Sequence, residues 1–328
     1  MFYIIESSNN PQWNLACEEY LFKGLNIPII RLWQNSPSVI IGLHQNSYAE
    51  INHQYVRENN IPVVRRLSGG GAVFHDLGNI NFTFIDERIP GESNSEMFAR
   101  FTAPIVRALH KLGIEAYLEG RNDLMIKGMK FSGNAVATYR NRVLQHGTLL
   151  FSSSISNLDK ALISRAEQFK DKSVKSIKSR VTNISEHLEK KITISQFLQH
   201  ITNSLISERG QYNPYIYTVE DLAAIAKLHL KKYSQDSWNW GLSPKFSYSK
   251  SSRFPFGLLE LHMEVEQGII KEIKFFGNFF FNLESSGLEE LLRGTPLTPE
   301  AIERRIEKIN LPDYFNGIAK EEFLSIFF

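Results

Sequence analysis

The sequence predicts an α+β fold with one large and one small domain. Its 328 residues exceed the ~100–200 residues of a typical single domain. Apolar and polar residues alternate over residues 80–85, which is typical of a strand, whereas apolar residues recur every three or four positions over 97–112, as on one face of a helix. Both the strand pattern and the helix pattern also occur in the C-terminal tail. We therefore expect a large domain at residues 1–240 and a small α+β domain at 245–328.

The first part of the chain combines one helix with short strands. Asn10-Pro11 predicts the start of the helix, because proline suits the first helical position, and apolar residues keep helical spacing from Trp13 to Gly24. Runs of apolar and β-branched residues predict the strands. The expected strands cover residues 1–7, 29–33, 38–43, 62–66, 72–74 and 80–85.

The middle of the chain begins with the long amphipathic helix over residues 97–112. Gly113 ends this helix, since glycine is favoured just after the last helical residue. Strands are expected to dominate residues 114–151. Helices are expected at 195–206 and 219–231, and a linker near 237–244.

The tail has the pattern of a hairpin packed on helices. Residues 259–266 alternate as in a half-buried strand, Gly268 permits a turn, and 269–276 form the partner strand. Helices are expected at 288–292 and 299–309.

Composition excludes several classes of protein. The 37 basic and 35 acidic residues nearly balance, so no overall charge points to nucleic acid or a membrane surface as a partner. The single cysteine, Cys17, excludes an intrachain disulfide and a cysteine-rich metal site, and its place on the apolar face of the first helix indicates a core residue. The N-terminus lacks a signal-peptide pattern, and no run reaches the ~18 apolar residues of a membrane span. We expect a cytoplasmic protein.

The densest motif is the run RRLSGGGAVFHD at residues 65–76. Three consecutive glycines remove every side chain, so the backbone can lie directly against a ligand and present N–H donors. Arg65 and Arg66 supply charge for a phosphate or carboxylate. A glycine-rich hairpin with solvated arginines is the alternative. The run fits neither a Walker loop nor the dinucleotide fingerprint.

A second motif places Lys130 after Asn122-Asp123. The Asp123 carboxylate is suited to a magnesium–phosphate unit, because hard cations prefer oxygen ligands. Lys130, before Phe131-Ser132-Gly133, can stabilise charge that develops between a carboxylate and a phosphate. A plain turn and an exposed lysine are the alternative.

Histidines and serines offer weaker candidates. His146 and Thr148, on either side of Gly147, can line a pocket from one strand, although a histidine there is more often structural. Ser68, Ser132 and His75 form no recognisable nucleophilic triad in the sequence, which argues against a hydrolase.

Together these motifs resemble the lipoate–protein ligases, and the tail resembles the accessory domain of their bacterial long form. The order and spacing agree over most of residues 1–240. The matching segments are 65–79 (RRLSGGGAVFHDLGN), 120–124 (GRNDL), 130–135 (KFSGNA), 146–150 (HGTLL) and 173–184 (SVKSIKSRVTNI).

The resemblance implies a biotin/lipoate ligase-like catalytic domain, related to class II tRNA synthetases, and two half-reactions. Lipoate and Mg-ATP give lipoyl-AMP and pyrophosphate, and a lysine of an acceptor protein then displaces AMP. It implies Lys130 as the catalytic residue, Asp123 as a Mg²⁺ ligand, and residues 170–180 as a loop over the adenylate. The implied binding residues for ATP and lipoyl-adenylate are Arg66, Ser68, Gly69, Gly70, Gly71, Ala72, Val73, Phe74, His75, Asn122, Asp123, Lys130, His146 and Gly147.

The implied partners are lipoate and lipoyl-domain acceptors, namely the E2 subunits of 2-oxoacid dehydrogenases and the glycine cleavage H protein. An octanoyl or lipoyl transferase of the same fold is one alternative, but it needs a cysteine after the lysine motif, and that region has none. A biotin–protein ligase is another alternative, although the sequence of its glycine loop is different. A non-enzymatic binding module leaves the joint occurrence of Arg66, Asp123 and Lys130 unexplained.

Overall fold

The structure is a computed structural model of the whole chain. It describes every residue except Asn46, Arg121, 163–180, 209–211, 241–247, Gln267, 280–282 and Phe328. Within the described residues, no helix combines the length and the apolar character needed to cross a membrane.

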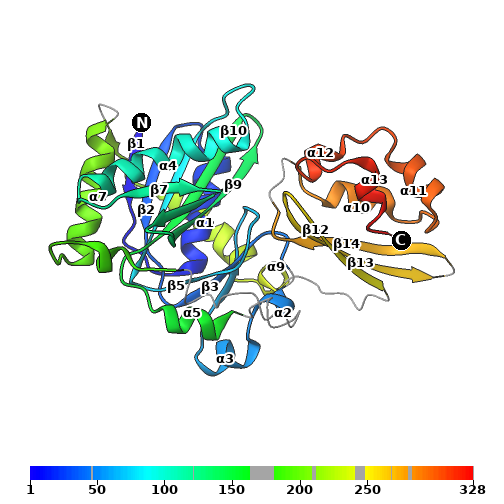
Figure 1. The fold of residues 1–328 in the computed structure, drawn as a ribbon, viewed down its shortest axis with the longest axis horizontal. Helices are drawn as coiled ribbons and strands as arrows, with labels where there is room; N and C mark the ends of the chain where they lie inside the picture. Colours follow the sequence, from blue (N-terminus) through cyan, green and yellow to red (C-terminus); the bar gives the residue numbers. More distant parts are fainter. Residues whose placement is uncertain are drawn as a thin grey trace.

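A large mixed sheet forms the centre of the main body (Figure 1). Its central strand β10 pairs antiparallel with β6 on one side and with β9 on the other. In sheet order the strands are β11 (Asn213–Pro214), β1 (Phe2–Ile5), β2 (Ile29–Trp33), β6 (Asn79–Glu87), β10 (Arg142–Leu150), β9 (Met129–Tyr139), β8 (Asp123–Ile126) and β7 (Ala116–Glu119).

A second, three-stranded sheet carries the glycine run. β3 (Ser38–Ile41) lies in its centre, parallel to β4 (Val63–Arg65) and antiparallel to β5 (Val73–His75). The glycine run therefore connects the two outer strands of this sheet. The short helices α2 (Ser47–Glu50), α3 (His53–Glu58) and α5 (Ile155–Ala161) belong to the same region (Figure 1).

Helices cover both faces of the large sheet. On one face, α4 (Asn94–His110) and α7 (Ile194–Glu208) share an apolar core with β2 and β6, to which Phe82, Phe101 and Phe197 contribute. On the other face lies α1 (Pro11–Gly24), which packs against α8 (Val219–Leu228) and the π-helical turn η3 (His229–Tyr233).

Local sequence signals account for the starts of these helices. The Asn10 side chain accepts a hydrogen bond from the Trp13 backbone, and proline follows at the first helical position. Ser93 and Glu96 form a capping box at the start of α4.

The C-terminal part has its own sheet and its own core. Strands β12 (Tyr248–Phe254), β13 (Gly257–Glu266) and β14 (Ile269–Gly277) form an antiparallel sheet. A phenylalanine-rich core lies between this sheet and the helices, α10 (Ser286–Leu292), α11 (Pro299–Ile306), α12 (Leu311–Tyr314) and α13 (Lys320–Leu324). It meets the main body where the Gly277 backbone N–H donates to the His44 carbonyl (2.7 Å) and Phe279 stacks on the His44 ring.

The predicted elements agree with the structure except in a few places. The region 237–244 was expected to be a linker, but Asp236–Asn239 form helix α9, with Asn239 buried; residues 241–247 lie outside the described part. The helix expected over 219–231 changes to a π-helical turn at His229. Strand β12 and the short helices α2, α3, α5, α12 and α13 were not predicted. Asn239 accepts a hydrogen bond from the Arg65 backbone, which explains why this segment is ordered against the main body.

Candidate functional site

A cavity of about 130 Å³ lies between the glycine run, the start of α1 and the central strands β6, β10 and β9. It is lined by Leu15, Trp33, Ile40, Arg66, Gly70, Gly71, Ala72, Val73, His75, Asn81, Asn122, Lys130, Gly133, Asn134, Ala135, His146, Gly147 and Thr148. The lining combines a basic, amide-rich part with an apolar part around Trp33. Such a cavity suits a ligand with a charged head and an apolar chain.

Arg66 orders the glycine run. Its Nη2 donates to the carbonyls of Gly69 (2.5 Å) and Gly71 (2.9 Å), and its Nε donates to the Ser68 hydroxyl (3.0 Å). Gly70 has a φ of 91°, a left-handed conformation that favours glycine. Burial lowers the pKa of Arg66 to about 10, so its guanidinium is still charged at neutral pH.

Arg65 has a different role from its neighbour. Its Nη1 donates to the carbonyls of Gly42, Leu43 and Gln45 at 2.8–3.0 Å. Its Nε donates to the backbone carbonyl of Trp238 (2.9 Å). Arg65 does not line the cavity. The suggestion that both arginines face a ligand is therefore wrong for Arg65, whose charge holds the 42–45 loop to helix α9.

Asn122, Asp123 and Lys130 meet at the edge of the cavity where β8 and β9 pair. Lys130 Nζ lies 2.8 Å from Asp123 Oδ1, and both side chains are 37% exposed. Asn122 and Asn134 exchange side-chain and backbone hydrogen bonds of 2.5 and 2.9 Å, which fixes the adjacent wall. Lys130 thus presents an ammonium group at the cavity with its position set by one carboxylate.

The segment after residue 180 lies next to Lys130. The Thr182 backbone N–H donates to the Lys130 carbonyl (2.9 Å), and Val181 pairs with Lys130 as an isolated bridge. The predicted loop at residues 170–180 lies outside the described residues. Val181 and Thr182, which follow this loop in the chain, contact Lys130 at the edge of the cavity.

His146 belongs to a buried hydrogen-bonded chain that the sequence did not reveal. Its Nε2 lies 2.6 Å from Ser68 Oγ, and its Nδ1 lies 2.9 Å from Glu18 Oε2. Burial opposes ionisation of Glu18, but the His146 ring and the Thr83 hydroxyl stabilise its carboxylate, and the pKa of Glu18 is lowered overall. Ser68 and His146 thus resemble part of a nucleophilic triad, but Arg66 donates to the same serine oxygen.

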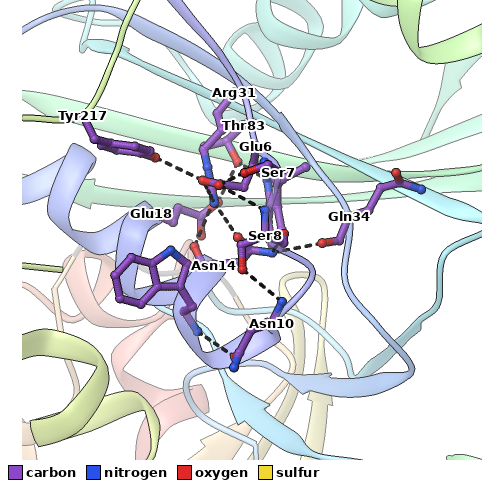
Figure 2. A network of polar contacts seen from close by, with 12 residues as sticks. Glu6, Ser7, Ser8, Asn10, Asn14, Glu18, Arg31, Gln34, Thr83 and Tyr217 are labelled. Atoms are coloured by element: carbon purple, nitrogen blue, oxygen red, sulfur yellow. Dashed lines mark hydrogen bonds and ion pairs between the residues drawn. The ribbon is translucent and has the colours of Figure 1, made fainter. Parts of the chain in front are cut away.

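Trp33 forms the apolar wall and is held from two sides. Its Nε1 donates to Thr83 Oγ1 (2.9 Å), and the Arg31 guanidinium lies 5.0 Å from its ring centroid. Arg31 is fully buried and bonded to Glu6 and Asn14, as Figure 2 shows. A rigid aromatic wall next to polar groups suits an acyl chain.

Several polar atoms around the cavity have no protein partner among the described residues. These atoms are His75 Nε2, Asn81 Nδ2 and Asn134 Oδ1. Burial, together with the nearby Arg66 charge, lowers the pKa of His75 to about 3, so its ring is neutral. Buried polar groups without partners are rare in native proteins and indicate a site for a ligand or water.

The structure brings most of the predicted residues to one cavity. Of the predicted set, Ser68, Gly69, Phe74 and Asp123 do not line it: Ser68 bonds His146, Gly69 accepts from Arg66, Phe74 is a core residue and Asp123 pairs with Lys130. Glu18, Trp33 and Thr83 were not predicted as part of the site. The polar residues that interrupt the apolar run in β6 were a usable signal, because they face the cavity and α1.

The described residues contain no group of three or more His, Cys, Asp or Glu side chains that could hold a metal ion. Cys17 is fully buried and does not line the cavity, and burial raises the pKa of its thiol to about 11. The prediction that Cys17 is a core residue is confirmed.

Two family models match the chain. The lipoyl protein ligase A/B catalytic domain matches residues 10–206, and the bacterial lipoate protein ligase C-terminus matches residues 243–327. The chain is 42% identical to lipoate-protein ligase LplJ of Bacillus subtilis over the full length of both chains. It is 38% identical to lipoate–protein ligase 1 of Staphylococcus aureus, with 98% of each chain covered.

Three solved structures are similar to the chain. P. falciparum LipL1 in complex with lipoate has a TM-score of 0.77 at 26% identity and covers 99% of this chain and 97% of that one. The bipartite ligase of Thermoplasma acidophilum, described with its E2 lipoyl domain, has a TM-score of 0.67 at 28% identity, covering 75% and 98%. Lipoate-protein ligase A bound with ATP has a TM-score of 0.64 at 26% identity, covering 74% and 98%.

These likenesses confirm the predicted fold, and neither rival enzyme class is favoured. The chain belongs to the lipoate–protein ligase family and is an enzyme of that class.

Proposed function

We propose that this cavity forms lipoyl-AMP and presents it to an acceptor lysine. A carboxylate oxygen of lipoate attacks the α-phosphorus of ATP, and pyrophosphate leaves. The ε-amine of the acceptor lysine then attacks the lipoyl carbonyl, loses a proton, and displaces AMP to form an amide. The observation that carries the proposal is the meeting of Arg66, Lys130 and the glycine run in one cavity with an apolar wall.

Each part of the cavity has a role in this reaction. Backbone groups of Gly71, Ala72 and Val73 hold the nucleotide and the adenylate, because no bulky side chain separates them from a ligand at Gly71. The Lys130 ammonium stabilises the charge shared between the carboxylate and the α-phosphate. Trp33 lines the path of the acyl chain.

Magnesium enters this scheme with ATP. Among the described residues, the Asp123 carboxylate lies beside Lys130, and Mg²⁺ is commonly held by one or two carboxylates together with substrate phosphates. The donor set therefore fits an ion brought by the nucleotide. Asp123 would hold it, and the ion would supply positive charge to the nucleotide phosphates.

The chain divides in this proposal into a catalytic domain at residues 1–240 and an accessory domain at 245–328. We place the enzyme in the cytoplasm. Its acceptors are lipoyl domains of 2-oxoacid dehydrogenase E2 subunits and the glycine cleavage H protein. The similarity to a ligase described with its E2 lipoyl domain supports this choice of acceptor.

Pyrophosphate release from ATP tests the first half-reaction. Lipoate, octanoate and biotin are offered separately to the full chain, with a reaction lacking any acid as the control. We expect release with lipoate and little with biotin. Release that is independent of lipoate, or faster with biotin, would refute the proposal.

A further inference from the structure

Glu18 is a buried carboxylate on α1 that no motif marks. It is 1% exposed and does not line the cavity. Two chains of hydrogen bonds lead from it to residues that do: one ends at Arg66 in the glycine run, and the other ends at Trp33 in the apolar wall.

The first chain has a defined direction. An ionised carboxylate only accepts, so His146 Nδ1 carries a proton and donates to Glu18 at 2.9 Å. His146 Nε2 lies 2.6 Å from Ser68 Oγ, and the same oxygen accepts from Arg66 Nε (3.0 Å), which leaves the Ser68 hydroxyl proton available to Nε2. Arg66 in turn donates to the carbonyls of Gly69 and Gly71. The Arg66 Nε–H therefore points toward Glu18 through Ser68, whereas Arg66 Nη2 points the other way, toward the glycine run.

The second chain starts at the other side of the same carboxylate. Thr83 Oγ1 donates to Glu18 Oε1 (2.7 Å) and accepts from Trp33 Nε1 (2.9 Å). Figure 2 shows Glu18 beside Thr83, next to the network around Arg31. The orientation of the indole ring therefore depends on the same acceptor as the orientation of His146.

We propose that Glu18 is a positioning residue that fixes both walls of the cavity: the Arg66-ordered glycine run through His146 and Ser68, and the Trp33 ring through Thr83. This inference rests on the proposed function, because it assigns the two walls to the nucleotide and to the acyl chain. Glu18 itself touches neither substrate.

A glutamine at position 18 has nearly the same shape but presents one oxygen acceptor in place of two. Because Thr83 donates to Oε1, the amide oxygen stays there, and the amide NH₂ replaces Oε2 at 2.9 Å from His146 Nδ1. The ring N–H keeps Oε1 as an acceptor at 3.0 Å but now has a second donor beside it. This contact displaces the ring or moves its proton to Nε2, and either change disturbs the hydrogen bond to Ser68.

Glu19 provides a matched control on the same helix. It is also buried, at 7% exposure, but it bonds Lys232 (2.7 Å), Tyr233 (2.7 Å) and Lys23 (3.1 Å). None of these residues lines the cavity. Glu19→Gln therefore disturbs another buried carboxylate of α1 without touching either chain.

The test compares the full-length variants Glu18→Gln, Thr83→Val and Glu19→Gln. For each, kcat and KM for ATP and for lipoate are measured by pyrophosphate release, and thermal unfolding is recorded. A displacement of about 1 Å at a reacting group can cost about a hundredfold in rate. We expect Glu18→Gln to lose about that factor in kcat/KM for both substrates, Thr83→Val to raise mainly the KM for lipoate, and Glu19→Gln to keep wild-type kinetics.

A second measurement reads the hydrogen-bond direction without using activity. Nitrogen-15 NMR of the histidine rings, with His146 assigned from a His146→Asn variant, should show a protonated Nδ1 in the wild type and either shifted ring signals or the Nε2–H tautomer in Glu18→Gln. Wild-type kinetics in Glu18→Gln, kinetic losses that only follow thermal stability in both glutamine variants, or an unchanged His146 ring would overturn the inference. If the wild type itself releases no pyrophosphate with lipoate, the proposed function fails first, which separates the two outcomes.

Discussion

Arg65 and Arg66 show how adjacent residues of one motif take different roles. Arg65 is the last residue of strand β4 and Arg66 follows it, and successive side chains along an extended backbone alternate between opposite sides. Arg65 binds protein carbonyls around the 42–45 loop, and Arg66 binds those of the glycine run. The motif predicted two cations near a ligand, but only the fold decides which of them lines the cavity.

Two buried histidines make stability depend on pH. Burial, with the Arg65 or Arg66 charge nearby, lowers the pKa of His44 and of His75 to about 3. In the unfolded chain a histidine has a pKa of about 6.5, so between pH 6.5 and 3 the unfolded state binds more protons. The contribution of each neutral ring to the free energy of unfolding is therefore fully present above pH 6.5. It decreases as pH falls, by about 1.5 kcal/mol between pH 6.5 and 5.

Urea unfolding at several pH values tests whether the protein loses stability as the pH falls. The free energy of unfolding should decrease between pH 6.5 and 5, and His75→Gln should remove about half of the decrease that the two rings contribute together. The range from pH 6.5 to 5 lies above the pKa values of ordinary carboxylates. Parallel pH curves for the wild type and His75→Gln would contradict the account.

At the scale of secondary structure, the cavity depends on the register of three strands. β10 pairs His146 with Thr83 on β6 and with Ala135 on β9. Residues far apart in the sequence therefore meet on the face that α1 covers. Gly147 is essential to this packing, because a methyl group there would collide with Asn134 and Phe82.

Gly147 and Gly71 should respond differently to substitution by alanine. Gly147→Ala overfills a packed strand and should cost about 1–3 kcal/mol of stability. A methyl group on Gly71 would have no neighbour within 4 Å among the described residues, so Gly71→Ala should change stability by less than about 0.5 kcal/mol. Because Gly71 lines the cavity, the same variant should raise the KM for ATP. Equal stability losses in the two variants would argue against this packing.

Local patterns predicted most elements because periodicity and capping act over a few residues. The long helix, the tail hairpin and the strands on both sides of the glycine run follow from such signals. The polar network around Glu18 could not be predicted, since it joins α1, β6, β10 and the glycine run through tertiary contacts. Trp33 was predicted as a strand residue, but its place in the cavity depends on the pairing of β2 with β6.

At the scale of the whole molecule, the accessory part has a separate core and contributes no described residue to the cavity lining. A chain that ends near Ser243 should therefore still bind lipoyl-AMP if it folds. One or both half-reactions can slow, because His44, which contacts Phe279, belongs to the 42–45 loop that Arg65 holds. Calorimetric titration of the shortened chain with lipoyl-AMP measures the binding. Loss of adenylate binding in a folded fragment would refute the prediction.

Acceptor docking should depend on salt more than adenylation does. The stretch at residues 170–180 carries Lys170, Lys172, Lys175, Lys178 and Arg180 on a chain of net charge +2. Attraction to an acidic acceptor is screened beyond about 8 Å at physiological salt, whereas contacts inside the cavity are not. Rates of transfer and of pyrophosphate release are compared over a range of NaCl concentrations. Equal salt sensitivity of the two half-reactions would count against charge-guided docking.

The most direct test of the ligase account is lipoate-dependent pyrophosphate release by Lys130→Ala and Cys17→Ser. Removing a preorganised charge-stabilising donor typically costs about 10²–10³ in rate. Lys130→Ala should therefore lose almost all release while remaining folded, since its side chain is 37% exposed, and Lys130→Arg should not restore it. Cys17→Ser should keep most activity with a modest loss of stability, because the thiol is buried in the core. The reverse pattern, an ATP-independent enzyme that tolerates Lys130→Ala and is inactivated by Cys17→Ser, would contradict the account.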